Sequence, residues 1–235
     1  MTTLKLLILL VALSTISSRI TSKDTYPKRT SIKGLQPDGQ DKNQIIGNQV
    51  HGVAFNFVWA FWQPSKKTSW ASGEVKYNGY CFKVDKSTAS QVKTYSDNGV
   101  VVTGVFYGVP SWARRNCPTG AAVSDIFCAP KDANAVDYGR FVGFIANYFN
   151  GQQAHGRVAD FVIHNEVNSP SWYNVGCSGT TCKKSKLDEW VTAYSKSYNK
   201  WIYEYKTISL RIIPTVKDGL KNHWLDMLIH SKVRR

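Results

Sequence analysis

Residues 157–176 carry the sequence RVADFVIHNEVNSPSWYNVG, which is the part of the chain that says most about the fold. Its residues 161–163 form a continuous apolar run, which is typical of a strand buried on both faces. The polar residues His164, Asn165, Glu166 and Asn168 follow at once, and then a loop rich in aromatic rings and amides. A buried parallel strand that ends in a carboxylate and leads into such a loop is typical of the active face of a β/α barrel. The alternative is that Glu166 is an ordinary solvated residue at the start of a loop.

The rest of the chain predicts strands and helices in alternation. Further strands are predicted over residues 50–62 and 100–107, and helices over residues 87–98, 132–150 and 186–205. Ser87 is the expected N-cap of the first helix, and Asn78-Gly79 marks the turn of a hairpin. A short strand within residues 207–216 and an amphipathic helix over 217–230 are expected to follow. The alternation predicts an α/β protein with a parallel sheet.

A strand that ends in Asn165-Glu166 resembles the fourth strand of the retaining glycoside hydrolases of clan A, which are (β/α)8 barrels. The wider string HNEVN with Trp172, Asn174 and Gly176, together with KGLQ and YNGYCF upstream, resembles an uncharacterised family of secreted glycosidase-like barrels over residues 34–205. The resemblance implies a (β/α) barrel of TIM type. It also implies that Glu166 is the general acid/base and that Asn165 binds the sugar 2-hydroxyl.

The candidate substrate-binding residues are polar or aromatic side chains at or near the expected strand ends: Asn56, Trp59, Trp112, His164, Asn165, Asn168, Trp172 and Asn174. Indole rings suit the C–H faces of pyranoses, and Trp112 follows a strand that resembles the third strand of such hydrolases. Two alternatives stay open, because Trp59 can fill the core and His164 can pack rather than touch substrate.

The catalytic nucleophile is not found in this chain. In the resembled clan it lies at the tip of the seventh strand, whereas at most one strand is expected after Glu166. None of Asp188, Glu189, Glu204, Asp218 and Asp226 follows a buried strand as a nucleophile should. The expectation is therefore an incomplete barrel of about four or five strands, and a very poor glycosidase at best.

Four segments are expected along the chain of 235 residues. Residues 1–18 have a basic residue, the apolar run LLILLVAL and then small residues, which predicts a secretory signal peptide. Residues 19–48 form an irregular lead-in, residues 49–216 the barrel portion and residues 217–235 a divergent tail. The protein is expected to be secreted, with no membrane span once the signal peptide is cleaved.

Five cysteines in a secreted chain predict disulfides in the oxidising compartment. The expected pairs are Cys117–Cys128 and Cys177–Cys182, with Cys81 free. The spacings do not match a zinc ligand set, and neither a metal nor another cofactor is expected.

The net charge of +14 favours acidic partners, but the basic residues are scattered and no nucleic-acid module is visible. The expected partner is a polysaccharide or oligosaccharide. Two other functions stay open: a carbohydrate-binding relic without catalysis, and a basic secreted interaction protein.

Overall fold

The computed structural model describes residues 34–37, 42–69, 71–118, 124–167, 169–177 and 183–212. Several sequence-based predictions lie outside these residues: the signal peptide over 1–18, Asn168, Cys182 and the helix over 217–230.

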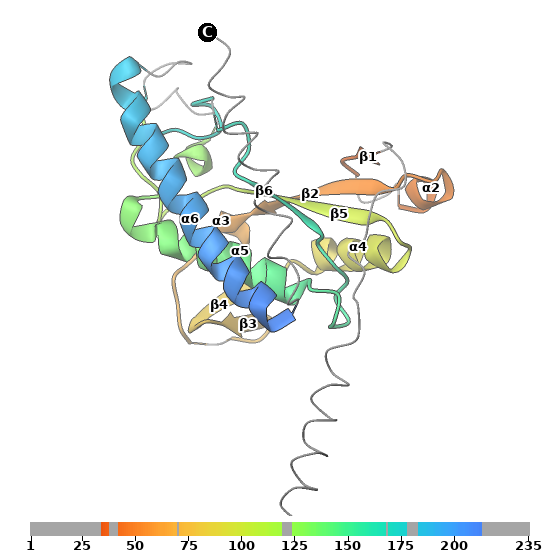
Figure 1. Ribbon diagram of the computed structural model, residues 1–235. Coiled ribbons are helices and arrows are strands. Elements are labelled where there is room, and N and C mark those ends of the chain that lie inside the picture. The colour runs from red at the N-terminus through yellow and green to blue at the C-terminus, as the bar shows by residue number, and fades with distance from the viewer. Residues whose placement is uncertain are drawn as a thin grey trace, which may run out of the picture.

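The centre of the protein is a four-stranded parallel sheet (Figure 1). Its strands lie in the order β1 (Gly34–Leu35), β2 (Gly52–Val58), β5 (Val101–Tyr107) and β6 (Asp160–Ile163). Helices alternate with them: α2 (Lys42–Gly47), α3 (Trp59–Trp62), α4 (Lys86–Asp97), α5 (Ala135–Tyr148) and α6 (Leu187–Ile212). Short 3-10 helices occupy Asp125–Phe127, Asp132–Asn134 and Lys184–Lys186. The predicted parallel α/β architecture is confirmed.

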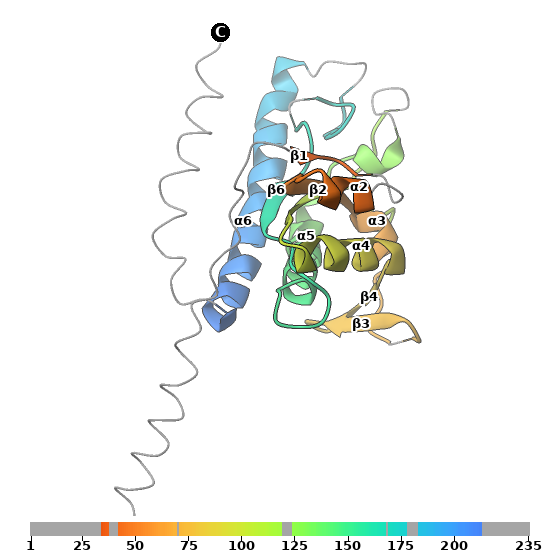
Figure 2. The ribbon, with the colours of Figure 1, turned by 90° about the vertical axis from the view of Figure 1, so that its right-hand side faces the viewer.

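The helices α4, α5 and α6 all pack against the same face of the sheet. Phe55 of β2 contacts Tyr95 of α4, Phe106 of β5 contacts Phe141 of α5, and Phe161 of β6 contacts Trp201 of α6. The ring centroids of these three pairs lie 5.8, 6.0 and 6.4 Å apart, within the usual range for aromatic pairs, and all six residues belong to or pack against one hydrophobic core. Figure 2 shows the helices below and beside the sheet, with α6 next to β6.

The opposite face of the sheet carries the alternate residues of each strand. Register places Asn56, Val105 and Val162 in one row and Ala54, Thr103 and Asp160 in the next. None of these six side chains belongs to the core that the helices form. The helix layer therefore covers one face only, among the residues that the structure describes.

The predicted hairpin is confirmed, with β3 (Glu74–Tyr77) antiparallel to β4 (Tyr80–Lys83). Asn78 and Gly79 connect the strands with φ angles of 44° and 84°. Two central residues with positive φ define the turn that matches the twist of a hairpin, and Asn-Gly is its preferred sequence.

Two strand predictions are corrected by the structure. Residues 59–62 form the helix α3 rather than the end of a strand, because Trp59 and Trp62 turn into the core beside Phe57 and Tyr138. The strand β6 is not buried on both faces, since Val162 is 42% exposed. It is the last strand of the sheet among the described residues, and the helices lie on its other face.

Three further details differ from prediction. The N-cap of α4 is Asp85 rather than Ser87, because the Asp85 carboxylate accepts from the Ser87 N–H at 3.0 Å. Residues 207–212 continue α6 instead of forming a strand, since a helix already in progress overrides the β preference of a short apolar run. The lead-in is not wholly irregular, because it contributes β1 and α2.

Candidate functional site

The carboxyl ends of β5 and β6 lie side by side, as the predicted parallel order requires. Phe106 pairs with Ile163, and the His164 N–H donates to the Phe106 carbonyl at 2.8 Å. The chain then leaves the sheet through Asn165, which is half-buried, and Glu166, which is exposed. Both His164 and Glu166 have positive φ, 59° and 39°. Glu166, the predicted general acid/base, is thus exposed to solvent at the carboxyl end of β6.

His164 lies inside the protein rather than at the surface. Its ring stacks on Tyr138 at 4.2 Å and meets Tyr173 edge-on at 4.6 Å. Burial lowers the pKa of the imidazole to about 3, so the ring is neutral at ordinary pH. Its Nε2 atom has no hydrogen-bond partner. His164 does not face solvent, and its packing against the two tyrosine rings holds the start of the loop in place.

Trp172 is part of an aromatic cluster that joins the two strand tips. Its half-buried indole meets Phe127 at 4.6 Å and Tyr107 at 5.8 Å, both near edge-on. Tyr107 is the last residue of β5, and Phe127 belongs to the loop that follows that strand. Because Phe127 and Tyr107 also stack on each other, the cluster holds Trp172 beside the tips of both strands.

The other two candidate tryptophans lie nearer the core. Trp59 is fully buried and donates its indole N–H to the Gln63 side chain at 2.8 Å. Trp112 is half-buried, meets Trp59 edge-on at 5.3 Å and donates to the Gln63 carbonyl at 3.2 Å. The Lys66 ammonium lies 5.7 Å from the centroid of the Trp112 ring. Trp59 is therefore a core residue, which was the alternative to a role in substrate binding.

The two candidate asparagines outside the β6 tip differ in environment. Asn56 is exposed and lies on the face of the sheet opposite the helices. Asn174 is fully buried, and its side-chain oxygen accepts from the N–H groups of Gly176 and Cys177, each at 2.7 Å. Asn174 thus shapes the loop that carries Trp172.

An ion-pair network lies next to this loop and was not predicted from the sequence. Arg115 donates to Glu189 at 2.6 Å and also pairs with Asp132, while Lys186 donates to Glu189 at 2.7 Å. A hydrogen bond from Lys196, with the charges of Arg115 and Lys196, lowers the pKa of Asp132. Arg115 and Glu189 are 74 residues apart, so no local pattern could have joined them.

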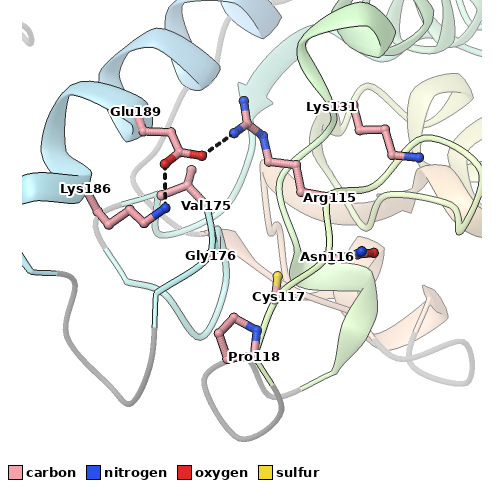
Figure 3. A pocket seen from close by; sticks show the side chains of 9 residues that line it. All are labelled: Arg115, Asn116, Cys117, Pro118, Lys131, Val175, Gly176, Lys186 and Glu189. Carbon is pink, nitrogen blue, oxygen red and sulfur yellow. Dashed lines mark hydrogen bonds and ion pairs between the residues drawn. The ribbon is translucent and has the colours of Figure 1, made fainter.

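A pocket of about 660 Å³ opens beside this network, between residues 115–118 and the turn at Gly176. Figure 3 shows Arg115 and Lys186 pointing toward the Glu189 carboxylate from two sides, while the Lys131 side chain points away from it. The guanidinium of Arg115 also donates to the Pro130 carbonyl at 3.0 Å. Because the Arg115 donors are already engaged, the network fastens the start of α6 to the loop after β5.

The disulfide Cys117–Cys128 is confirmed and closes the loop that carries Phe127. Cys177 is also disulfide-bonded, and its predicted partner Cys182 lies outside the described residues. Cys81 is free, as predicted, and it is buried. Within the described ranges, no three His, Cys, Asp or Glu side chains gather as metal ligands would. No helix in that same part of the chain has the length and apolar character to cross a membrane.

Comparison with known proteins places the chain in a family. The model of a family of unknown function, DUF5722, matches residues 25–209. No curated protein matches the chain, and neither does any solved structure.

Proposed function

Because the chain belongs to DUF5722, a family of unknown function, we propose its function from the groups at the strand tips. The protein is secreted, and its fold is part of a (β/α) barrel like that of glycoside hydrolases. It binds a polysaccharide or oligosaccharide. Glu166 occupies the position of the general acid/base, and the Trp172 loop contacts the sugar.

The observation that carries the proposal is the backbone at the end of β6. His164 and Glu166 are two of only four non-glycine residues with positive φ among the described residues. Each such conformation costs on the order of 1–3 kcal/mol, and strained residues of this kind cluster at active sites and ligand clamps. Here the strain aims an exposed carboxylate outward from the carboxyl end of a parallel strand.

The location of the helices on one face of the sheet favours a barrel architecture. In a doubly wound sheet helices cover both faces, whereas in a (β/α) barrel every helix lies outside the ring of strands. The contacts of Tyr95, Phe141 and Trp201 put three consecutive helices on one face of this sheet. Asn56, Val105 and Val162 then take the positions that point into a barrel.

The side chains at the tips suit a saccharide. The half-buried Trp172 offers an apolar ring, and Asn165 beside Glu166 offers an amide that can both donate and accept hydrogen bonds. The cluster of Tyr107 and Phe127 holds the indole in place, which lowers the entropy that binding must overcome.

Binding is favoured over efficient turnover. A retaining glycosidase needs a second carboxylate about 5 Å from the acid. Among the described residues, Asp125, Asp132, Asp137 and Glu189 are engaged with Lys or Arg, and Asp160 lies at the opposite, amino end of β6. A single positioned acid accelerates hydrolysis by only about 10²–10⁴-fold.

The test compares the protein with its Glu166→Gln variant on neutral oligosaccharides. We expect both to bind with affinities within about twofold, since the amide keeps the shape of the carboxyl, and we expect neither protein to hydrolyse the sugars above the background of the assay, since the second carboxylate is missing. Calorimetry and a reducing-sugar assay measure the two quantities. Efficient hydrolysis that Glu166→Gln abolishes would show instead that a second carboxylate completes an active enzyme.

A further inference from the structure

Phe61 exposes an aromatic ring at the carboxyl edge of the sheet. It belongs to α3, which begins directly after the last residue of β2. Its exposed fraction is 66%, whereas Trp59 and Trp62 of the same short helix are almost wholly buried. Of the large hydrophobic side chains that are exposed in the described part of the chain, Phe61 and Tyr203 are the aromatic ones. Single exposed apolar residues are common, so the surroundings of Phe61 decide whether its ring has a role.

The packing of the two tryptophans fixes the direction in which Phe61 points. Trp59 lies parallel to Phe141, and Trp62 meets Phe144, and both phenylalanines belong to α5 in the helix layer. At 100° per residue, Trp59 and Trp62 lie on one side of α3, about 60° apart, and Phe61 lies about 130° from the middle of that side. Phe61 therefore points away from the helix layer.

The aromatic cluster at the tip of β5 points away from the same layer. Tyr107 follows Phe106, which belongs to the core that the helices cover, and successive side chains of a strand point to opposite faces. Tyr107 therefore lies on the face opposite the helices, and Trp172 and Phe127 pack against its ring. Phe61 and this cluster thus share both the carboxyl edge of the sheet and the direction away from the helices.

The backbone holds Phe61 close to the cluster. The Ala60 N–H donates to the Gly108 carbonyl at 2.8 Å, so the residue before Phe61 is bonded to the residue after Tyr107. Because consecutive Cα atoms are 3.8 Å apart, the Cα atoms of Phe61 and Tyr107 are less than about 15 Å apart. Gly108 has a φ of 75°, and a Cβ at this position would clash with Val58. A glycine thus allows α3 to lie directly beside the tip of β5.

The row of aromatic side chains along this edge is longer than one sugar ring. Phe61 follows β2 and Trp172 follows β6, and β5 lies between those two strands. Neighbouring strands are about 4.8 Å apart, so the ends of β2 and β6 are about 10 Å apart. A monosaccharide is too small to cover both rings, whereas consecutive units of an extended chain can reach from one to the other. Glu166 lies at the β6 end of this row.

We propose that Phe61 binds a further unit of the saccharide, so that the preferred ligand is a linear chain laid across the ends of β2, β5 and β6. One unit lies on Trp172 beside Glu166, and a unit further along the chain covers the Phe61 ring with its apolar C–H face. The burial of Trp59 and Trp62 holds α3 in place, so little freedom is lost on binding. This inference rests on the proposed saccharide function and adds the length of the ligand and the direction in which it lies.

Calorimetric titration of the full chain with linear gluco-, manno- and xylo-oligosaccharides of two to six units tests the proposal. We expect the affinity of the wild type to rise with chain length. Phe61→Ala should remove most of this rise: it should weaken binding of the longest chain at least about fivefold and change that of the disaccharide less than about twofold. Phe61→Trp keeps an aromatic ring and should keep the rise.

Two control variants separate this role from others. Trp172→Ala should weaken binding of every length, because each ligand occupies the position beside Glu166. Tyr203→Ala removes a ring that is 70% exposed and lies about 24 Å along α6 from its first residue, and it should change no affinity. Near-ultraviolet circular dichroism checks that the variants fold.

Three results would overturn the proposal, and they distinguish it from the saccharide function itself. A wild-type affinity that does not rise with chain length would mean that the site holds a short ligand only. A rise that Phe61→Ala leaves unchanged would mean that Phe61 is ordinary exposed surface. Both of these results leave the saccharide function standing. If the wild type binds none of the oligosaccharides, the saccharide function fails and this inference fails with it.

Discussion

His164 and Glu166 lie two residues apart and share an uncommon backbone conformation, yet their surroundings are opposite. The imidazole is 4% exposed between Tyr138 and Tyr173, whereas the carboxylate is in solvent. The buried ring of His164 holds the turn in place, and the turn places the Glu166 carboxylate in solvent. An anchor of this kind has a measurable cost, because a ring held neutral by burial cannot take up a proton when the pH falls.

Stability should therefore fall with pH in a window that His164 sets. The folded pKa is about 3 and the unfolded value is near 6.5, so the unfolded state binds the proton first. The contribution of the neutral imidazole to the free energy of unfolding is fully present above about pH 6.5. It is lost as the pH falls toward 3, by up to about 1.4 kcal/mol per pH unit. Urea unfolding between pH 7 and 4 measures the slope, and His164→Phe should remove this part of it.

The control for that experiment is His155→Phe, which replaces a half-buried histidine whose ring stacks on Tyr148 at 4.0 Å. The control should keep the slope of the wild type. Equal slopes in the wild type and in His164→Phe would show that the buried imidazole does not govern acid stability.

The helices and strands that depend on local chemistry could be predicted from local sequence patterns. Asn78-Gly79 was enough for the hairpin, and the apolar runs were enough for β5 and β6. Contacts distant in sequence were beyond reach: the covering of Trp59 by Trp112 and Tyr138, the Arg115–Glu189 pair, and the strand β1 of only two residues. For the same reason the sequence predicts the surroundings of the candidate residues only in part. Glu166 and Trp172 follow a recognisable strand, whereas the burial of His164 and Asn174 depends on packing.

The contact between α5 and α6 depends on a glycine. A Cβ added at Gly139 would lie 2.8 Å from the backbone carbon and oxygen of Lys200, closer than real side chains approach. Gly139→Ala should destabilise the protein by about 1–3 kcal/mol, although alanine is the better helix former by about 1 kcal/mol. The midpoint of urea unfolding measures the change.

The matched control is Gly47→Ala, at the last residue of α2, where an added Cβ meets nothing within 4 Å. This variant should be neutral or slightly more stable than the wild type. If Gly139→Ala proved as stable as Gly47→Ala, the two helices would not be in backbone contact at that point.

The sheet and the net charge of the protein favour two different functions. The sheet, with helices on one face and Glu166 at its carboxyl edge, favours a saccharide site of barrel type. The net charge of +14 favours a basic interaction protein, the second candidate. Salt separates them, because screening weakens attraction between exposed charges and leaves the stacking of a ring on a sugar largely unchanged.

The most direct test is calorimetric titration with a panel of neutral oligosaccharides at low and at high salt. The protein and its Trp172→Ala variant are compared, with Tyr203→Ala as the control for loss of an exposed aromatic ring on α6. We expect binding that salt changes little, that Trp172→Ala weakens at least about tenfold and that Tyr203→Ala leaves intact. No binding to any neutral oligosaccharide, with tight binding to polyanions that salt abolishes, would contradict it.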